Sequence, residues 1–482
     1  MNYKMISYYI GKILLVEGVL LIFPAIGSIL YNDGTLLAFS VTIALLAATG
    51  LIAIKQKPSK TNIFAKDGYV IVALSWILMS FFGAMPFFIS GHIPNFIDAF
   101  FETVSGFTTT GSTILTNVES LPKSLLFWRS FTHWIGGMGI LVFVIAIMPK
   151  TENHSMHVMR AEVPGPTVGK LVSKLRATAR ILYGIYCVLT LVQIAMLWAG
   201  GMPLFDSIVN SFATAGTGGF SILGKSIEGY NSLYTEMVIA IFMLIFGVNF
   251  NLYYMILIKH GKQALKSEEL RWYIGIIATS VIIIALSLMS ENHEAGYSFR
   301  HAFFQVSSII TTTGFSSTNF DTWPAIAKLI LVFLMFIGAC AGSTGGGIKV
   351  SRLIILVKSG FRDIKKAINP RSIETVKVDR RSVDEPVVKS VSVFFATYMI
   401  VMAASMFIVA IDGNDLVTTS SSVIACMGNI GPGLGAVGPY GNFADFSVLS
   451  KLVLCFDMLA GRLELIPMLM LFSPYAWSRK YS

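Results

Sequence analysis

The chain has 482 residues, of which 54% are hydrophobic and only 13% are charged, and its formal net charge is +10. A mean hydropathy of +0.71 lies outside the range of soluble globular domains, so the composition excludes an ordinary soluble protein. The positive charge does not indicate nucleic-acid binding, because the Lys and Arg residues lie between apolar stretches and not along one soluble face. The four cysteines have neither a paired nor a metal-ligand spacing, which argues against disulfides and zinc sites.

Apolar stretches of membrane-spanning length recur along the chain. About 20 predominantly apolar residues cross a hydrocarbon core of about 30 Å as a helix. The first stretch lies near Met1, and we interpret it as a retained anchor because it is long, lacks a small-residue cleavage site and precedes a second span. The clearest predicted spans are residues 13–30, 70–89, 272–289 and 391–411.

Basic residues concentrate in segments between these spans. By the positive-inside rule such segments belong on the cytoplasmic face, and both chain termini go with them. The intervening segments are acidic with few basic residues, and an acidic outer face would raise the local cation concentration modestly. The basic segments are residues 55–66, 160–180, 259–271, 349–389 and 479–480.

One pattern occurs four times: a span, a half-length apolar segment, a stretch rich in Gly and Thr, and a second span. The half-length segments are too short to cross, so each enters and leaves on the same side. Non-helical backbone at that depth is tolerated only where protein buries it or water lines it. The sequence thus predicts an all-α integral membrane protein with four pseudo-symmetric M1-P-M2 pore repeats (span, pore helix with loop, span) after two N-terminal transmembrane helices. The expected boundaries are 1–60 for these two helices and 61–160, 161–265, 266–370 and 371–482 for the repeats.

The Gly/Thr stretches are a candidate selectivity filter for a cation. A dehydrated cation needs oxygens such as the rings of backbone carbonyls in potassium channels. Glycine permits the dihedrals that turn successive carbonyls towards an axis, and threonine hydroxyls can add oxygens in the first and third copies. Ordinary Gly-rich turns or helix-packing points are the alternative, which four copies in register disfavour. The candidate filter residues are Thr109, Thr110, Gly111, Thr217, Gly218, Gly219, Thr312, Thr313, Gly314, Asn429, Ile430 and Gly431.

The second span of the third repeat contains five glycines between Gly338 and Gly347. Each weakens a continuous helix by about 1 kcal/mol relative to alanine, so we expect a break in this helix. A phosphate-binding loop is disfavoured, because the segment lacks the Gly-Lys-Ser/Thr ending and no strand precedes it. The candidate gate residues in this segment are Gly342, Ser343, Thr344, Gly345, Gly346 and Gly347.

Six motifs together resemble the Trk family of potassium uptake proteins, in the superfamily that includes the Ktr and plant HKT transporters. They are TTTGST, WIGGMGILVF, TTTGF, GSTGGGIKV, GNIGPG and AGRLE. The resemblance covers essentially the whole chain, and the two N-terminal spans are more similar to the TrkH branch than to the shorter KtrB branch. The second copy, TAGTGGF, departs from the pattern, since Gly218 stands where the first and third copies have Thr110 and Thr313.

This resemblance implies the pore-forming subunit of a potassium uptake system in a bacterial inner membrane. It implies K+ as the transported ion, held at the filter residues, with no cofactor in the chain. It also implies a homodimer in the membrane lipid and a cytoplasmic nucleotide-binding regulatory subunit similar to TrkA. In the family the segment matching 342–347 is an intramembrane loop that obstructs the pore below the filter, and an arginine matching Arg462 belongs to the constriction.

Arg462 lies inside an apolar span, where a charged side chain is costly and usually faces a cavity or a partner. An ion pair with Asp457 or Glu464, or snorkelling towards the inner surface, are the alternatives to a pore-facing side chain. Arg129 and His133, in the second span of the first repeat, are interpreted as packing or interfacial residues. Segment 349–389 is a solvated connection and a candidate docking surface for the regulatory subunit.

Gated passive conduction of K+ into the cell is the function these features favour. A Na+- or H+-coupled K+ symporter is an alternative, but such proteins often use inverted repeats and midplane carboxylates, whereas these repeats share one orientation. A less selective K+/Na+ pathway is a second alternative; some relatives replace a filter glycine with serine, and this chain keeps all four. An enzyme is not expected, because no HExxH, paired catalytic carboxylates or nucleophile motif is found.

Overall fold

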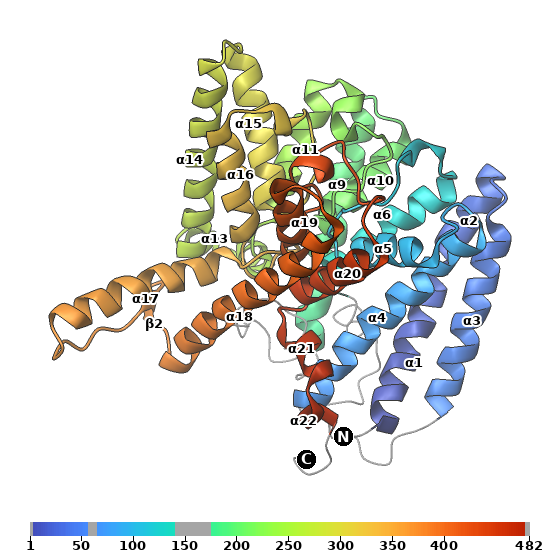
Figure 1. Ribbon diagram of the computed structural model, residues 1–482, viewed down its shortest axis with the longest axis horizontal. Coiled ribbons are helices and arrows are strands. Elements are labelled where there is room, and N and C mark those ends of the chain that lie inside the picture. Colours follow the sequence, from blue (N-terminus) through green and yellow to red (C-terminus); the bar gives the residue numbers. More distant parts are fainter. Residues whose placement is uncertain (1–2, 56–64, 140–174, 478–482) are drawn as a thin grey trace.

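The computed structural model describes residues 3–55, 65–139 and 175–477 (Figure 1). Residues 140–143, at the end of the WIGGMGILVF motif, lie outside these ranges. Several residues of the predicted basic segments do so as well: Lys57, Lys60, Arg160, Lys170, Lys174, Arg479 and Lys480.

Two N-terminal spans form an antiparallel pair at one side of the molecule (Figure 1). The first consists of α1 (Tyr3–Leu20) and α2 (Ile22–Tyr31), and α3 (Leu36–Lys55) returns along it. The two backbones approach closely at two glycines, since a β-carbon at Gly11 would lie 2.8 Å from the carbonyl oxygen of Gly50. Small residues at a contact allow such close packing inside a membrane.

Each of the four repeats then supplies one long first helix, one short pore helix and a second helix. The long first helices are α4 (Ala65–Ile89), α9 (Leu175–Ala199), α14 (Glu268–Ser290) and α18 (Glu385–Val409). The pore helices are α5 (Phe96–Phe107), α10 (Leu204–Gly216), α15 (Ala295–Ile310) and α19 (Leu416–Gly428). The second helices begin with α6 (Lys123–Gly137), α11 (Leu233–Phe246), α16 (Ala325–Ile337) and α20 (Val448–Arg462).

Six helices in the described part of the chain are long and apolar enough to cross a membrane. They include the four predicted spans, although the first begins at Tyr3 and not at residue 13. The pore helices have 12 to 16 residues, too short to cross, as predicted. The six spans are Tyr3–Tyr31, Leu36–Lys55, Lys66–Ile89, Ala179–Ala199, Glu268–Ser290 and Glu385–Asp412.

The second helix is broken in three repeats, although the glycine pattern predicts a break only in the third. In the third repeat, α16 and α17 (Val350–Ile368) are separated by residues 338–349, which include the predicted Gly-rich segment. In the second repeat the chain bends by 88° between α11 and α12 (Phe250–Leu257). In the fourth, α20 and α21 (Ile466–Phe472) are separated by a turn in which Glu464 and Leu465 have φ of +58° and +66°. A leucine in the left-handed region gives no sequence signal, because tertiary contacts impose that conformation.

At the end of the third repeat, α17 projects from the bundle and the chain returns to α18 through a short hairpin (Figure 1). The hairpin pairs β1 (Lys377–Val378) with β2 (Arg381–Ser382), a small exception to the all-α prediction. The other α-helices of the described residues are α13 (Gly261–Ala264) and α22 (Pro474–Trp477). Short 3-10 turns lie at Val118–Ser120, Ser226–Tyr230, Phe320–Thr322, Ala410–Asp412 and Gly435–Val437.

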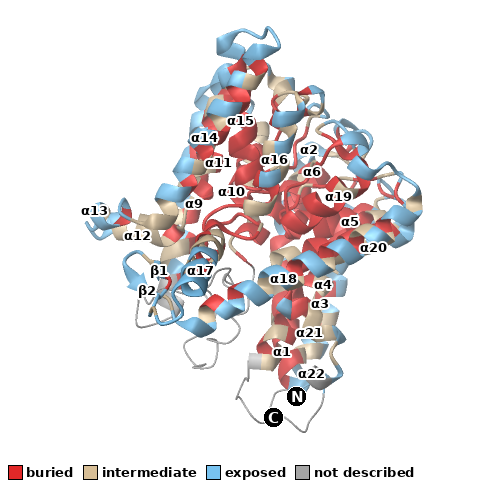
Figure 2. Ribbon diagram, turned by 60° about the vertical axis from the view of Figure 1, so that its left-hand side comes forward, coloured by how far each residue is buried: buried red, intermediate tan, exposed pale blue. Residues whose placement is uncertain are grey.

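Burial is greatest at the pore helices and the loops that follow them, which lie inside the bundle (Figure 2). The long helices at the periphery expose apolar side chains instead; Leu37, Leu191 and Phe407 are 71%, 64% and 80% exposed. Exposed apolar surface on this scale is the expected outer surface of a helical protein in lipid.

Asp33 ties the N-terminal pair to the first repeat through the turn between α2 and α3. Its carboxylate accepts hydrogen bonds from the hydroxyls of Ser28 and Thr35 at 2.7 and 2.8 Å and from the amide of Ser124 at 3.0 Å. Partial burial opposes the charge, but these hydrogen bonds outweigh it and lower the pKa of Asp33 to about 2. The charged carboxylate of Asp33 therefore attaches this turn to the start of α6.

We expect Asp33→Asn to lower the melting temperature of the detergent-solubilised protein at pH 7. Because the folded-state pKa of Asp33 is depressed, its stabilisation is fully present above the unfolded-state value of about 3.9 and is lost as the pH falls towards 2. The variant and the wild type should therefore become more similar in melting temperature between pH 4 and pH 2. A difference that stays constant over this range would contradict the role of the charge.

A candidate filter and gate at the centre of the four repeats

The four pore helices end at four loops with the same backbone conformation. The residue two before the repeat glycine is left-handed in every copy, with φ of +55° to +59° at Thr109, Thr217, Thr312 and Asn429. The next amide turns back to the carbonyl six residues before the glycine; Thr110, Gly218, Thr313 and Ile430 donate to Ser105, Ala213, Ser308 and Ala425 at 2.8 to 3.0 Å. The carbonyls of these four small residues therefore accept the same hydrogen bond in all copies.

The four repeat glycines meet in one closed ring. All have positive φ, with +87° at Gly111, +73° at Gly219, +83° at Gly314 and +96° at Gly431. A β-carbon on each would meet the carbonyl oxygen just before the glycine of the following loop, the fourth loop closing onto the first. These distances are 2.1 Å from Gly111 to Gly218, 1.9 Å from Gly219 to Thr313, 1.8 Å from Gly314 to Ile430 and 2.8 Å from Gly431 to Thr110.

This ring offers backbone oxygens, and its surroundings favour a cation. The C-terminal ends of the four pore helices lead into it, and a helix C-terminus carries a partial negative charge. The hydroxyls of Thr110 and Thr313 bond to those of Thr108 and Thr311 in their own loops, both at 2.8 Å. These four hydroxyls are thus paired within their own loops, whereas the backbone carbonyls before the ring glycines lie against the neighbouring loop. A pocket of about 100 Å³ whose lining includes all four ring glycines lies directly beside the ring.

His133 explains why the second loop differs from the others. A β-carbon at Gly218 would lie 2.2 Å from Nδ1 of His133, so a threonine there would overlap the imidazole ring. His133 is fully buried, lies 2.8 Å through Nδ1 from the carbonyl oxygen of Gly106, and accepts from the amide of Phe220 through Nε2 at 3.3 Å. The departure in the second copy is therefore compensated by a side chain of the first repeat.

We expect Gly218→Ala to destabilise the protein and reduce ion flux, since overpacking a filled site costs about 1–3 kcal/mol. Combining it with His133→Ala should restore part of the loss, because the second change removes the atoms with which the new methyl group collides. Melting temperature and Rb+ uptake of the two single variants and the double variant measure this coupling. Strictly additive effects would show that His133 does not set the space at Gly218.

Arg129 and Glu102 together hold the backbone that follows the first and second ring glycines. The sequence alone did not predict this role. The two side chains are buried and form an ion pair at 2.6 Å between α6 and α5. Glu102 also accepts from the amide of Ile114 at 3.0 Å, and Arg129 donates to the carbonyl of Ser221 at 2.9 Å. A charged residue in an apolar helix is a sequence signal for a buried partner, but it does not show which residue that partner is.

The Gly-rich segment of the third repeat lies against the ends of the third and fourth pore helices. The amide of Gly346 donates to the hydroxyl of Thr312 at 2.6 Å, and a β-carbon at Gly346 would lie 2.6 Å from the carbonyl oxygen of Gly428. Thr344 donates through its hydroxyl to the carbonyl of Phe246 at 3.3 Å, and Lys349 donates to the carbonyl of Gly345. The segment is therefore in direct contact with the filter loops.

Arg462 bridges three repeats at the same level. Its guanidinium donates to the carbonyl of Thr344 at 2.7 Å and to those of Gly136 and Gly137 at 2.5 and 2.7 Å. The two alternative partners are used elsewhere, since Glu464 pairs with Arg352 at 2.5 Å and Asp457 accepts from Ser405 at 2.7 Å. The structure thus brings Arg462 together with the Gly-rich segment.

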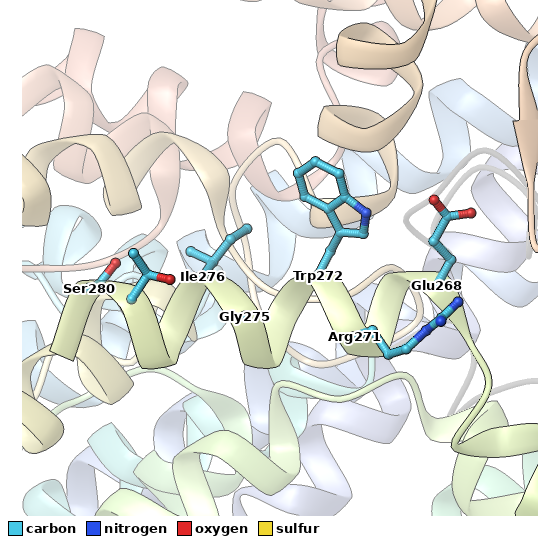
Figure 3. Close-up of a pocket in the computed structure, with 7 residues that line it drawn as sticks. Glu268, Arg271, Trp272, Gly275, Ile276 and Ser280 are labelled. Atoms are coloured by element: carbon cyan, nitrogen blue, oxygen red, sulfur yellow. The ribbon is translucent and has the colours of Figure 1, made fainter. Parts of the chain in front are cut away.

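A second hollow lies away from the ring, along one side of α14 (Figure 3). Its volume is about 660 Å³, and its lining residues all belong to this one helix, including Arg271, Trp272 and Ile276. None of the candidate filter or gate residues lines it. We therefore place the candidate site at the ring.

Four re-entrant loops that meet in a closed ring of carbonyls inside an apolar helical bundle define a pore-loop membrane protein. A match to the TrkH family, described as a cation transport protein, extends over residues 37–481. The chain belongs to this family, which confirms the resemblance and identifies a multi-pass membrane transport protein and not an enzyme.

Two curated relatives and one solved structure show how far the similarity extends. The chain is 37% identical over 484 residues to the Trk system potassium uptake protein TrkH of Salmonella typhimurium, covering 99% of this chain and 100% of the relative. It is 32% identical over 479 residues to the Trk system potassium uptake protein TrkG of Escherichia coli, covering 98% of each. The crystal structure of the potassium transporter TrkH from Vibrio parahaemolyticus aligns with a TM-score of 0.90 and 34% identity, covering 99% of this chain and 100% of that one. The fold with four pore repeats is confirmed by this match.

Proposed function

We propose that the chain is the pore-forming subunit of a potassium uptake system and conducts K+ inward through the ring of Gly111, Gly219, Gly314 and Gly431. The closed ring of carbonyls is the observation that carries this proposal, because it can replace the hydration shell of a cation at one point on the axis. The names of the relatives supply the ion. A membrane potential drives such flux with about 2.3 kcal/mol per charge per 100 mV.

In this proposal the filter comprises Thr109 to Gly111, Thr217 to Gly219, Thr312 to Gly314 and Asn429 to Gly431, and the gate is formed by residues 342–347 with Arg462. The contacts between the Gly-rich segment, the filter loops and Arg462 favour it. A cation leaving the filter would meet both the loop and a positive charge. Opening then requires that the loop and Arg462 move apart.

The cellular context belongs to the same proposal. The protein acts in a bacterial inner membrane with both termini in the cytoplasm, as a homodimer, together with a TrkA-like nucleotide-binding regulatory subunit. The repeats are assigned to 61–160, 161–265, 266–370 and 371–482, after the N-terminal pair. Three crossings precede the first pore loop, so a cytoplasmic Tyr3 would put the filter mouth at the outer face, which supports inward conduction.

Uptake of radioactive Rb+ into proteoliposomes under an inside-negative potential tests the proposal. We expect uptake without any co-ion gradient, inhibited by excess K+ and weakly by Na+. Uptake that requires a Na+ or H+ gradient would favour the coupled symporter instead. Equal inhibition by Na+ and K+ would favour the less selective pathway.

A further inference from the structure

Two adjacent acidic residues at the start of α14, Glu268 and Glu269, contact two structures that lie far from each other along the chain. Glu269 contacts the Gly-rich segment of the third repeat, and Glu268 contacts the hairpin of β1 and β2. Glu268 lies on the first turn of α14 (Figure 3). Neither carboxylate has a role in the filter and gate as proposed above.

Glu269 holds the Gly-rich segment on both of its sides. One carboxylate oxygen, Oε1, accepts from the amide of Ala341 at 2.7 Å and from the amide of Ser351 at 3.2 Å. Ala341 precedes the segment 342–347, and Ser351 lies in the first turn of α17, after it. Hydrogen bonds to an ionised acceptor are roughly twice as strong as those between neutral groups. A single side chain from another helix therefore fixes the span between the two ends of the candidate gate.

Glu268 holds the hairpin in a reciprocal arrangement. Its amide donates to the carboxylate of Asp379 at 2.6 Å, and the amide of Asp379 donates back to Glu268 at 3.1 Å. Asp379 and Arg380 form the tight turn between β1 and β2, with φ of +50° and +64°. Lys358 of α17 pairs with Glu268 and donates to the carbonyl of Lys377 at 2.7 Å. The hairpin is thereby attached to the same helical turn that carries Glu269.

We propose that Glu269 is a positioning residue for the intramembrane loop and that Glu268 couples it to the hairpin. Displacement of the hairpin then shifts the first turn of α14 and loosens the loop, because the two carboxylates are neighbours on one rigid turn. The consequence for ion flux rests on the proposed gate. The consequence for loop position does not, since it concerns contacts alone.

Cys340 is a native reporter of loop position. It is fully buried and directly precedes Ala341, while its own amide donates to the carbonyl of Gly247 at 3.1 Å. In the full-length protein, labelling by a charged methanethiosulfonate reagent can be followed by mass spectrometry of the peptide that carries Cys340. Cys455, which is also buried and lies in α20, reports global unfolding in the same sample.

We expect Glu269→Ala to raise the labelling rate of Cys340 about tenfold or more while that of Cys455 is unchanged, since two charge-assisted hydrogen bonds are lost. Glu269→Gln should lie between the wild type and Glu269→Ala, because its amide oxygen can accept both hydrogen bonds but without the charge. The matched control is Glu374→Gln. Glu374 is an exposed glutamate between α17 and the hairpin, and it pairs with Lys365 at 3.7 Å. An unchanged Cys340 rate in folded Glu269→Ala would overturn the positioning role.

Asp379→Ala tests the coupling without altering the loop or Glu269, and it keeps the proposal testable should Glu269→Ala fail to fold. A raised Cys340 rate in this variant is expected, and an unchanged rate would overturn the coupling. In proteoliposomes, Glu269→Ala should raise Rb+ uptake while leaving the preference for K+ over Na+ intact; altered preference would place Glu269 in the support of the filter and overturn the assignment. If the wild type showed no K+ uptake but the two substitutions still raised the labelling rate of Cys340, the proposed function would be refuted and this inference would stand.

Discussion

Replacing Gly314 by serine should reduce Rb+ uptake at least about tenfold and remove the preference for K+ over Na+ in what remains. Gly314 has φ of +83°, a region that costs an L-residue roughly 1–2 kcal/mol. Its new β-carbon would lie 1.8 Å from the carbonyl oxygen of Ile430 and 2.8 Å from Cδ of Pro432. The fourth loop must therefore move, and because the ring is closed the other carbonyls move with it. Uptake with K+ or Na+ as competitor measures both effects.

Gly296→Ser is the matched control for this variant. Gly296 lies in the first turn of α15, the same pore helix, and a β-carbon there meets no atom within 4 Å. Its uptake and ion preference should equal those of the wild type. If Gly314→Ser retained the wild-type preference while Gly296→Ser did too, the ring could not be the selective element, and the proposed filter would have to be abandoned.

Removing the charge of Arg462 should raise the passive flux of K+. At a separation of about 8 Å and an effective dielectric constant of about 20, a unit positive charge opposes a cation by about 2 kcal/mol, or roughly 30-fold. Arg462→Gln also removes donors to Thr344, Gly136 and Gly137, so the loop loses an attachment to two other repeats. Rb+ uptake by proteoliposomes that contain this chain alone is the measurement.

Two further variants separate charge from anchoring at this site. Arg462→Lys keeps the charge but cannot reach three carbonyls as the guanidinium does, so its flux should lie between those of the wild type and Arg462→Gln. Arg271→Gln removes an exposed positive charge on α14 and should leave uptake unchanged. Unaltered uptake in a folded Arg462→Gln protein would show that this side chain is no part of the barrier.

The membrane class and the four repeats could be predicted from the sequence because both depend on local properties. A helix in lipid must satisfy its own backbone groups and cover itself with apolar side chains, so each span is visible in its composition. The repeat glycines can be recognised in the sequence because each position has a positive φ and no room for a β-carbon, and glycine alone meets both conditions easily. These positions are Gly111, Gly219, Gly314 and Gly431. The break in the third repeat was visible for the same reason, through the glycines between Gly338 and Gly347.

The roles of Arg129 and His133 could not be predicted, since each depends on partners from distant segments. Arg129 pairs with Glu102 of the preceding pore helix and reaches Ser221 in the second repeat. His133 occupies the space that Gly218 leaves empty, although the two are far apart in the chain. A single sequence shows a charge or an imidazole in an apolar helix, but not the group that compensates it.

Membrane spans, four similar pore units and the glycine at the turn of each unit could all be predicted from the amino-acid pattern. The closing of the four glycines into one ring in chain order, the hydrogen bond from Arg462 to Thr344 and the contacts of Glu269 on both sides of the Gly-rich segment are visible only in the folded chain. The two groups of features differ in the range of the interactions behind them. Hydropathy and backbone conformation act within a few residues, whereas hydrogen bonds between repeats depend on how all four pack around a common axis.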